Sequence, residues 1–381
     1  MKKNPKLRGL SLFANVGVAE ALLEGLGVDI RVANELLPER AKFYQEVYPR
    51  SHMVCGDITD DKVRADLIKE AKSKDVNFVM ATPPCQGMSR VGKMEEMDER
   101  NHLIYYAVDV IKKLRPEYVL IENVTTILHT KIAVDGKVMM IPEYLAMELG
   151  DKYNFNKKTV VRAMDYSIPQ IRHRNIFLLV RKDKKISWEF PEPTPVKTLE
   201  DAIGKLPSVD PILREGEAFT IQKFPKYLER KNAALKVSKW HRPPLHSWRM
   251  VEWMMHTPTG ESAISNPVYY PKKKDGVRVS AHYNQYRRLE WHKPSRCLTQ
   301  NNGVISSLAC VHPGRPYKSN GEVLYSDPRV FTIYEVMIVS SLPLDWPIPD
   351  WADETLIRKV IGEGVPSHLI EVIVRGLIER I

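Results

Sequence analysis

The sequence predicts an α/β fold with a doubly wound, mostly parallel sheet, followed by a second, smaller, loop-rich domain. Two observations predict it. Over the first 180 residues, short apolar segments alternate with helical patterns, and this alternation places parallel strands in one sheet with helices on its faces. After Val180 the chain becomes proline-rich and irregular, which marks a boundary. Ligands of such a sheet are expected at the carboxyl ends of its strands.

Five apolar segments have the composition of buried parallel strands. They are rich in Val, Ile, Leu and Phe and end in polar or turn residues, as strands covered on both faces do. We therefore expect strands over residues 9–14, 29–35, 52–57, 77–82 and 118–124. The segments 159–166 and 174–181 are expected to close the sheet as a pair of strands.

Helical patterns lie between these segments. Apolar residues recur at roughly every third or fourth position over 17–27, 37–48, 60–73 and 101–115, so a helix is expected at each. The pattern resumes over 332–343 and 354–381. Because the last segment is amphipathic, we expect it to dock on the first domain.

These patterns divide the chain into three parts. An α/β domain is expected over residues 1–183 and a loop-rich domain over 184–325. A C-terminal segment, residues 326–381, is expected to return to the first domain.

The composition is typical of a soluble globular enzyme, with 43% hydrophobic and 27% charged residues. We find no apolar stretch long enough to span a membrane and no signal peptide. The four cysteines, Cys55, Cys85, Cys297 and Cys310, have no metal-binding spacing, so neither a structural zinc nor a disulfide framework is expected. We expect a cytoplasmic protein that binds no metal.

Positive charge is concentrated between Lys231 and Arg296. This segment has 13 Lys and Arg against 4 Asp and Glu, and so accounts for most of the net charge of +10. Tryptophans and tyrosines are interleaved with the cations, as on surfaces that bind nucleic acids. A solvated basic surface is the alternative. Five arginines in this segment could grip guanine edges: Arg242, Arg249, Arg278, Arg287 and Arg288.

One short stretch carries the most specific signal. Residues 81–89 read "ATPPCQGMS", with a cysteine behind two prolines where a strand ends. "IENV" follows at 121–124 and "QIRHR" at 170–174. In this order the motifs resemble those of the cytosine-C5 DNA methyltransferases, over most of the chain. The resemblance implies the fold of S-adenosylmethionine-dependent methyltransferases, with catalysis and cofactor binding in 1–183 and target recognition in 184–325.

The resemblance implies covalent catalysis on cytosine. Carbon 5 of cytosine becomes nucleophilic once a thiolate adds to carbon 6, and Cys85 is the candidate thiol. Glu122 would neutralise ring N3 as a general acid, with its pKa raised by a dry pocket. Arg172 and Arg174 would hold the cytosine O2 and organise Glu122. Because this face of a paired base is buried, the target must be flipped out of the duplex.

The cofactor implied by the resemblance is S-adenosyl-L-methionine. Phe13 would stack on its adenosyl group, Glu35 would bind the ribose hydroxyls and Asp57 the adenine amino group. The candidate cofactor residues are Phe13, Gly17, Glu35, Asp57, Ile58, Pro84 and Leu103. A segment similar to the family's mobile loop, which closes over double-stranded DNA, contains Ser89, Arg90 and Lys93.

The sequence departs from the family pattern near the cofactor. Asn15 and Val18 replace two glycines of the loop Phe-x-Gly-x-Gly-Gly; asparagine tolerates positive φ, whereas Val18 implies an altered start to the next helix. In the last motif, usually Gly-Asn-Ser/Ala-Val, Glu363 and Gly364 replace the middle pair. Tyr334 stands where an arginine is expected. These departures bear on cofactor affinity more than on the chemical step.

Three other functions share features with this sequence. An amino methyltransferase needs Asp, Asn or Ser before the two prolines and an aromatic residue after them, whereas the chain has Thr82 and Cys85, so this function is excluded. The tRNA-methylating branch of the family shares Pro-Pro-Cys-Gln, but the large basic, aromatic segment favours DNA. A DNA-binding regulator without methylating activity is the third. The expected partner is a restriction endonuclease acting on the same site, and the expected state is a monomer.

Overall fold

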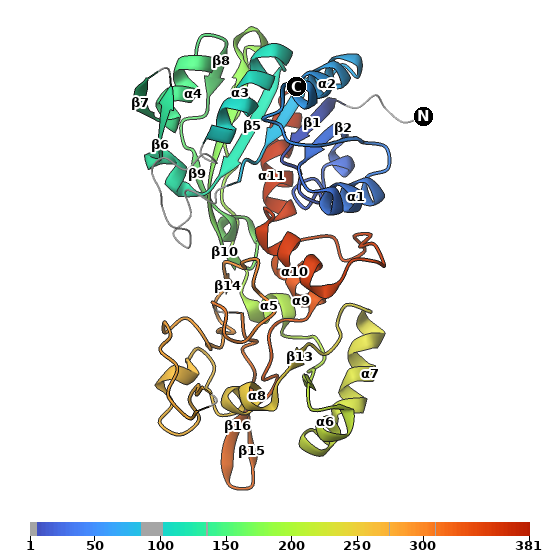
Figure 1. The fold of residues 1–381 in the computed structure, drawn as a ribbon, viewed down its shortest axis with the longest axis vertical. Helices are drawn as coiled ribbons and strands as arrows, with labels where there is room; N and C mark the ends of the chain where they lie inside the picture. The colour runs from blue at the N-terminus through green and yellow to red at the C-terminus, as the bar shows by residue number, and fades with distance from the viewer. Residues whose placement is uncertain (1–5, 85–101, 135, 274, 309) are drawn as a thin grey trace.

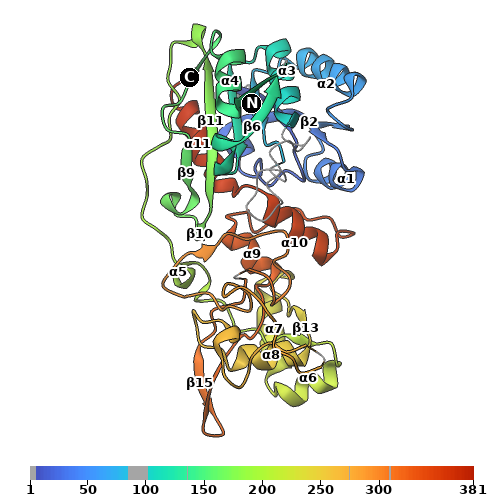
Figure 2. The same ribbon diagram turned by 60° about the vertical axis from the view of Figure 1, so that its left-hand side comes forward.

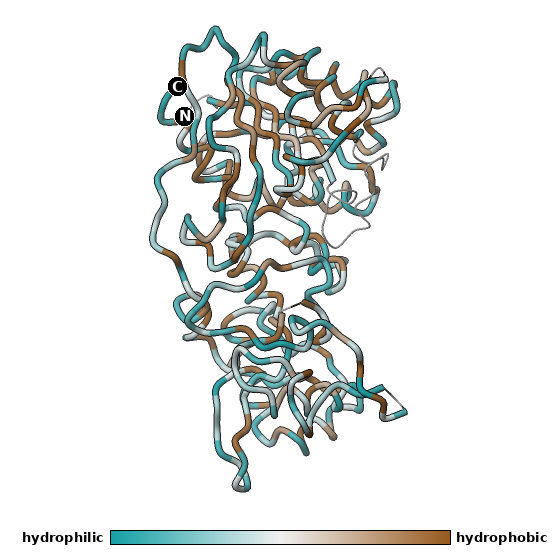
Figure 3. Tube along the Cα trace, turned by 90° about the vertical axis from the view of Figure 1, so that its left-hand side faces the viewer, coloured by the Kyte–Doolittle hydropathy of each residue, from teal (hydrophilic) through white to brown (hydrophobic). Residues whose placement is uncertain are grey.

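The computed structural model describes residues 6–84, 102–134, 136–273, 275–308 and 310–381. Figure 1 shows two lobes stacked along the long axis, with the large sheet in the upper lobe and short helices and hairpins in the lower one. After the sheet, the chain runs along the outside of the molecule into the lower lobe (Figure 2). Hydrophobic residues gather in the middle of the upper lobe, whereas the lower lobe is more mixed (Figure 3).

Within the described residues, the large sheet has eight strands in the order β3-β2-β1-β4-β5-β11-β8, with β9 also paired to β11. β1 to β5 are parallel, and β11 is antiparallel to its neighbours. The predicted fold and its closing strands are therefore confirmed. The bounds are β1 (Leu7–Leu12), β2 (Val28–Glu35), β3 (His52–Cys55), β4 (Phe78–Ala81), β5 (Tyr118–Asn123), β8 (Tyr153–Phe155), β9 (Val160–Arg162) and β11 (His173–Arg181).

Helices cover both faces of this sheet. Val119 of β5 packs in one hydrophobic cluster and its neighbour Leu120 packs in another, because successive strand residues point to opposite faces. The first cluster contains residues of α2 (Asp61–Ser73), α3 (Leu103–Leu114) and α4 (Ile141–Leu149), and the second contains residues of α11 (Ser367–Ile378). The C-terminal helix thus docks on the first domain, as predicted.

A third hydrophobic cluster, which we call the bridging cluster, joins the two lobes. It contains Val18 from the loop after β1 (residues 13–18, the β1 loop) and Phe43 from α1 (Pro38–Val47). These residues pack with side chains of α5 (Leu199–Ile203), α9 (Ile333–Val339) and α10 (Glu354–Glu363). The cluster therefore connects the β1 loop to segments that come much later in the sequence.

The prediction of a helix over residues 17–27 is wrong. The segment forms successive turns, closed by bonds such as that from Leu23 N–H to the Glu20 carbonyl at 2.9 Å, and ends in a short 3-10 helix, Glu24–Leu26. Val18 packs in the bridging cluster, whereas Leu23 packs on the sheet. Because these apolar residues pack in two different places, tertiary packing overrides the helical period.

The segment 354–381 contains two helices, α10 and α11. Pro366, between them, cannot continue a helix, and the residue before a proline is biased away from helical backbone. Gly364 already has extended backbone, with φ −62° and ψ 159°. The last two residues of α10 together with Gly364 form what we call the C-terminal turn, residues 362–364.

The lower lobe is built from short elements, as its weak periodicity predicts. The parallel pair β10–β14 joins the two lobes. The division of the chain at residues 183 and 325 stays a prediction. The remaining bounds are β6 (Lys131–Val134), β7 (Lys137–Met140), β10 (Gln170–Ile171), α6 (Glu217–Lys223), α7 (Tyr227–Val237), β12 (Ile212–Leu213), β13 (Leu245–His246), α8 (Trp248–Met255), β14 (Ser295–Arg296), β15 (Pro316–Ser319) and β16 (Glu322–Tyr325).

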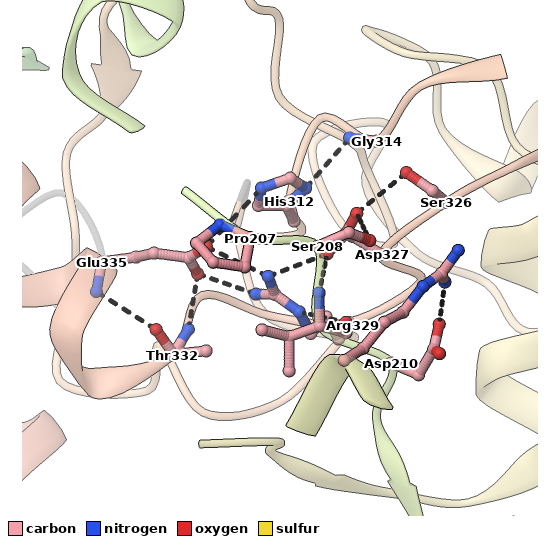
Figure 4. Close-up of polar contacts among 12 residues, drawn as sticks. Pro207, Ser208, Asp210, His312, Gly314, Ser326, Asp327, Arg329, Thr332 and Glu335 are labelled. Atoms are coloured by element: carbon pink, nitrogen blue, oxygen red, sulfur yellow. Dashed lines mark hydrogen bonds and ion pairs between the residues drawn. The ribbon is translucent and has the colours of Figure 1, made fainter. Parts of the chain in front are cut away.

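A buried ion cluster lies where the lower lobe meets α9 (Figure 4). Arg329 is fully buried and donates to the Glu335 carboxylate at 2.7 and 3.0 Å and to Asp327 at 3.0 Å. The Nδ1 atom of His312 accepts from Gly314 N–H at 3.1 Å, and its Nε2 atom lies 3.6 Å from Glu335. Because such charges are stable in the interior only when paired, the cluster keeps these segments together.

Acid is expected to destabilise the fold through His312. Burial lowers its pKa from 6.5 to about 4, and its Nδ1 lone pair is already bonded to Gly314 N–H, so the folded state holds the neutral ring. The unfolded chain takes up a proton below pH 6.5. The contribution of the neutral His312 ring to the free energy of unfolding is therefore fully present above pH 6.5. This contribution, on the order of 3 kcal/mol, is lost as the pH falls toward 4. Thermal unfolding midpoints across this range measure the loss.

The control for this prediction is His312→Asn. Its amide oxygen can still accept from Gly314 but does not titrate. The unfolding midpoint of this variant should depend less on pH between 6.5 and 4 than that of the unchanged protein. An equal pH dependence in the two proteins would contradict a role for His312.

In the described part of the chain, none of the helices combines the length and apolar character needed to cross a membrane. Nor do the described residues include a group of three or more His, Cys, Asp or Glu side chains positioned to hold a metal ion.

Candidate active site

A cleft of about 2130 Å³ lies between the two lobes. Its upper wall includes residues at the carboxyl ends of β1 to β5, where an α/β sheet is expected to bind its ligands. Its lower wall includes residues from 284–308, and the C-terminal turn lines it as well. The cleft therefore collects residues from all three parts of the chain.

Glu122 and Arg174 form an ion pair in this cleft. Glu122 lies near the end of β5 and is 6% exposed, and its Oε1 atom is 2.7 Å from Nε of Arg174 on the neighbouring strand β11. Burial raises the pKa of Glu122, and the positive charges of Arg174 and Arg172 only partly offset this. The carboxyl group can therefore carry a proton closer to neutral pH than an exposed glutamate and act as a general acid.

Arg172 has different contacts from Arg174. It is 3% exposed, and its guanidinium donates to the carbonyls of Leu298 at 2.9 Å, Gly362 at 3.1 Å and Glu363 at 3.0 Å. It thus ties the residue between β10 and β11 to the segment after β14 and to the C-terminal turn. In this structure Arg174 is the arginine paired with Glu122.

The predicted nucleophile Cys85 lies outside the described residues, as do Ser89, Arg90 and Lys93. The two prolines before Cys85 line the same cleft as Glu122. The Asn123 side chain donates to the Pro83 carbonyl at 3.0 Å, which ties the end of β4 to the end of β5. The last described residues before Cys85 therefore lie in the wall that holds Glu122.

The candidate cofactor residues share the cleft with these catalytic candidates. Six of the seven line it: Phe13, Glu35, Asp57, Ile58, Pro84 and Leu103. Gly17 is not among the lining residues. Its φ is +82°, and an added Cβ would lie 2.1 Å from the ring of Tyr48. The glycine is thus required by close packing on Tyr48 and by positive φ, rather than by an approach to the cleft.

Asn15 keeps the turn of the β1 loop, as predicted. Its φ is +50°, in the left-handed region that asparagine tolerates. Its backbone N–H donates to Oε2 of Glu35 at 2.9 Å, and the other carboxylate oxygen of Glu35 accepts from Leu37 N–H at 3.0 Å. Two backbone groups therefore hold the Glu35 side chain at the edge of the cleft.

The family model of C-5 cytosine-specific DNA methylases matches residues 7–379. The chain belongs to this family. The Type II methyltransferase M1.HgaI of Avibacterium volantium is 40% identical, over 99% of both chains. The Type II methyltransferase M1.HphI of Haemophilus parahaemolyticus is 24% identical, over 97% of this chain and 86% of the other.

Solved structures have the same fold as this methylase. A protein described as a DNA modification methyltransferase encoded within a prophage (E. coli) superposes with a TM-score of 0.64 at 20% identity, over 98% of both chains. A mutant of DNMT2 from Spodoptera frugiperda superposes with a TM-score of 0.59 at 15% identity, over 98% of this chain and 99% of the other. These neighbours match both lobes and not the sheet alone.

The five arginines predicted to contact bases occupy different environments in this methylase. Arg287 and Arg288 border the cleft, whereas Arg242, Arg249 and Arg278 are exposed outside its described lining. Arg288 is fully buried, and its guanidinium donates to backbone carbonyls, including those of Met254 and His312. Because these bonds occupy the N–H donors of its guanidinium group, the structure contradicts the prediction that Arg288 contacts a base.

The sequence analysis missed several polar residues on the lower wall of the methylase cleft. They lie in or near β14, whose pairing with β10 brings this segment of the chain to Arg172. Their basic and amide side chains are suited to contact a polar ligand, but the local sequence does not reveal the strand pairing that places them in the cleft. They are Lys293, Arg296, Gln300 and Asn301.

Proposed function

We propose that this chain transfers a methyl group from S-adenosylmethionine to carbon 5 of a flipped-out cytosine in double-stranded DNA, through a covalent bond between Cys85 and carbon 6. One observation supports this most directly. The buried carboxyl group of Glu122, held by Arg174, lines one cleft together with the candidate cofactor residues and with Pro84, which precedes Cys85.

The residues at the upper wall of the cleft fit S-adenosylmethionine. Each carboxylate oxygen of Glu35 accepts one backbone N–H and has a further lone pair to accept a ribose hydroxyl. Phe13 offers a ring and Asp57 an exposed carboxylate to the adenosyl group. When bound, the cofactor supplies an electrophilic methyl group.

The protein residues prepare the base for this methyl group. The Cys85 thiolate adds to carbon 6 while Glu122 donates its proton to N3, so the ring does not accumulate negative charge. Arg174 orients Glu122 and would contact the cytosine O2. After transfer, the hydrogen on carbon 5 leaves as a proton to water, and its electron pair re-forms the 5,6 double bond while the C6–S bond breaks and releases the thiolate. N3 then returns its proton to Glu122.

The proposed substrate is double-stranded DNA. Basic residues on the lower wall, including Arg287, Lys293 and Arg296, could contact the phosphates around an extruded base. Arg242, Arg249 and Arg278 are proposed contacts farther along the duplex. The Type II names of the relatives support a role in restriction and modification. An endonuclease of the same site is the proposed partner, and a monomer is the proposed state.

Radioactive methyl transfer tests the substrate. Tritiated S-adenosylmethionine is incubated with the protein and duplex DNA, tRNA or no nucleic acid. Label in DNA is the expected result. Label in tRNA alone would indicate a tRNA methyltransferase, and no label despite DNA binding would indicate a regulator.

Duplex DNA with 5-fluorocytosine at the target tests the covalent step. Fluorine cannot leave as a proton, so the protein should stay bonded to the base as a complex that survives a denaturing gel. Binding of DNA and cofactor without such a complex would argue against attack by Cys85.

A further inference from the structure

Two segments far apart in the sequence meet at the cofactor end of the cleft. The β1 loop and the C-terminal turn both line it. The Asn15 side chain donates to the Val360 carbonyl at 3.3 Å, just before the turn. Arg40 of α1 pairs with Glu363 of the turn at 2.8 Å. The turn is thus held against the segments that carry the candidate cofactor residues.

The closest contact between these segments joins Val18 and Gly364. Val18 is 2% exposed and packs in the bridging cluster. A Cβ atom added to Gly364 would lie 2.8 Å from both Cβ and Cγ1 of Val18, whereas carbon atoms in contact are separated by about 3.5–4.0 Å. The backbone of Gly364, with φ −62° and ψ 159°, suits any residue. Glycine is therefore required at position 364 by the contact with Val18 and not by the backbone conformation.

The sizes of these two residues are consequently linked. Val18 brings Cβ and both Cγ atoms into this contact, whereas Gly364 has no side chain. The larger residue in the β1 loop is matched by a smaller one in the C-terminal turn.

The C-terminal turn has little freedom to move away from Val18. Arg172 holds the carbonyls of Gly362 and Glu363 at 3.1 and 3.0 Å. A Cβ added to Gly362 would lie 2.2 Å from the Thr299 carbonyl oxygen, so the two backbones are in direct contact. A larger residue at position 364 would therefore displace the β1 loop rather than the turn.

We propose that Val18 and Gly364 form a size-matched pair that positions the β1 loop, and with it Phe13 and Asn15, to bind S-adenosylmethionine. This inference rests on the proposed cofactor. Val18 and Gly364 are positioning residues, because they act through the conformation of the loop.

A double-mutant cycle tests the pair. Gly364→Ala is expected to weaken binding of S-adenosylhomocysteine, measured by titration calorimetry, by roughly 5- to 100-fold. Adding Val18→Gly removes the opposing carbon atoms and should restore most of the affinity. Adding Val18→Ala instead leaves its Cβ at 2.8 Å and should restore less. In steady-state assays, Gly364→Ala should raise KM for the cofactor and leave KM for DNA unchanged.

Gly25→Ala is the matched control. A Cβ there meets no atom within 4 Å, so the affinity should not change. Thermal unfolding of the ligand-free variants provides a second measurement, in which Gly364→Ala should cost less stability in the Val18→Gly background than in the unchanged protein, because Val18→Gly has its own cost from the bridging cluster.

The outcomes separate the pair from the proposed cofactor. If the unchanged protein failed to bind S-adenosylhomocysteine, the proposed cofactor and this inference would both be overturned. If it bound, but Gly364→Ala lowered affinity and stability as much in the Val18→Gly background as in the unchanged protein, the inference alone would be overturned.

Discussion

Cys85→Ala is expected to abolish methyl transfer, lowering its rate by about four orders of magnitude or more. Without the thiolate, carbon 5 of cytosine is a poor nucleophile, and none of the remaining candidate residues can add to carbon 6. Binding of duplex DNA should change little, because the thiol acts after the base has left the stack. Single-turnover transfer of tritium and a gel-shift titration measure the two properties separately.

A second cysteine provides the control. Cys55, at the end of β3, is exposed and is absent from the described lining of the cleft, so Cys55→Ala should retain full activity. Loss of DNA binding along with activity in Cys85→Ala would instead indicate that Cys85 is structural.

Glu122→Gln is expected to lower kcat by roughly 100- to 10,000-fold, the contribution of a general acid. Glutamine has nearly the same shape but no proton to give to N3. Because burial raises the pKa of Glu122, the acid form is present below that raised pKa. The kcat of the unchanged enzyme should therefore fall as the pH rises through it, and that of Glu122→Gln should not. Rapid-quench measurements of a single turnover across pH test both statements.

The other end of the same strand offers a matched control. Glu117 precedes β5 and forms a partly exposed ion pair with Lys184 at 2.6 Å, outside the described lining of the cleft. Glu117→Gln should leave kcat and its pH dependence unchanged. If the two variants lost activity equally, the loss would come from β5 as a whole and not from a proton on Glu122.

The ends of the strands explain why the candidate site can form where it does. Glu122 and the prolines before Cys85 come from the adjacent parallel strands β5 and β4, whose carboxyl ends lie at one edge of the sheet. The antiparallel strand β11 brings Arg174 to this edge from the opposite direction. The order of the strands and their pairing are therefore enough to bring together the Glu122 carboxyl group, the Arg174 guanidinium and the prolines that precede Cys85.

By itself, the sequence determined the strands, most of the helices and the identity of the catalytic candidates. Buried strands have a local composition, and amphipathic helices such as α3 have a local period. The motifs around Cys85, Glu122 and Arg174 are also local, because each chemical role demands one residue type. For Asn15, the tolerance of asparagine for positive φ was enough to predict the turn.

Only the tertiary structure decided what distant segments do to one another. Residues 17–27 have a helical period but form turns, because Val18 and Leu23 pack in different clusters. Arg287 and Arg288 are neighbours of one residue type that both border the cleft, yet Arg287 is half-buried, whereas Arg288 is fully buried and donates its hydrogen bonds to backbone carbonyls. The physical reason is that burial and contact depend on which chain segment lies opposite, and no local pattern contains that information.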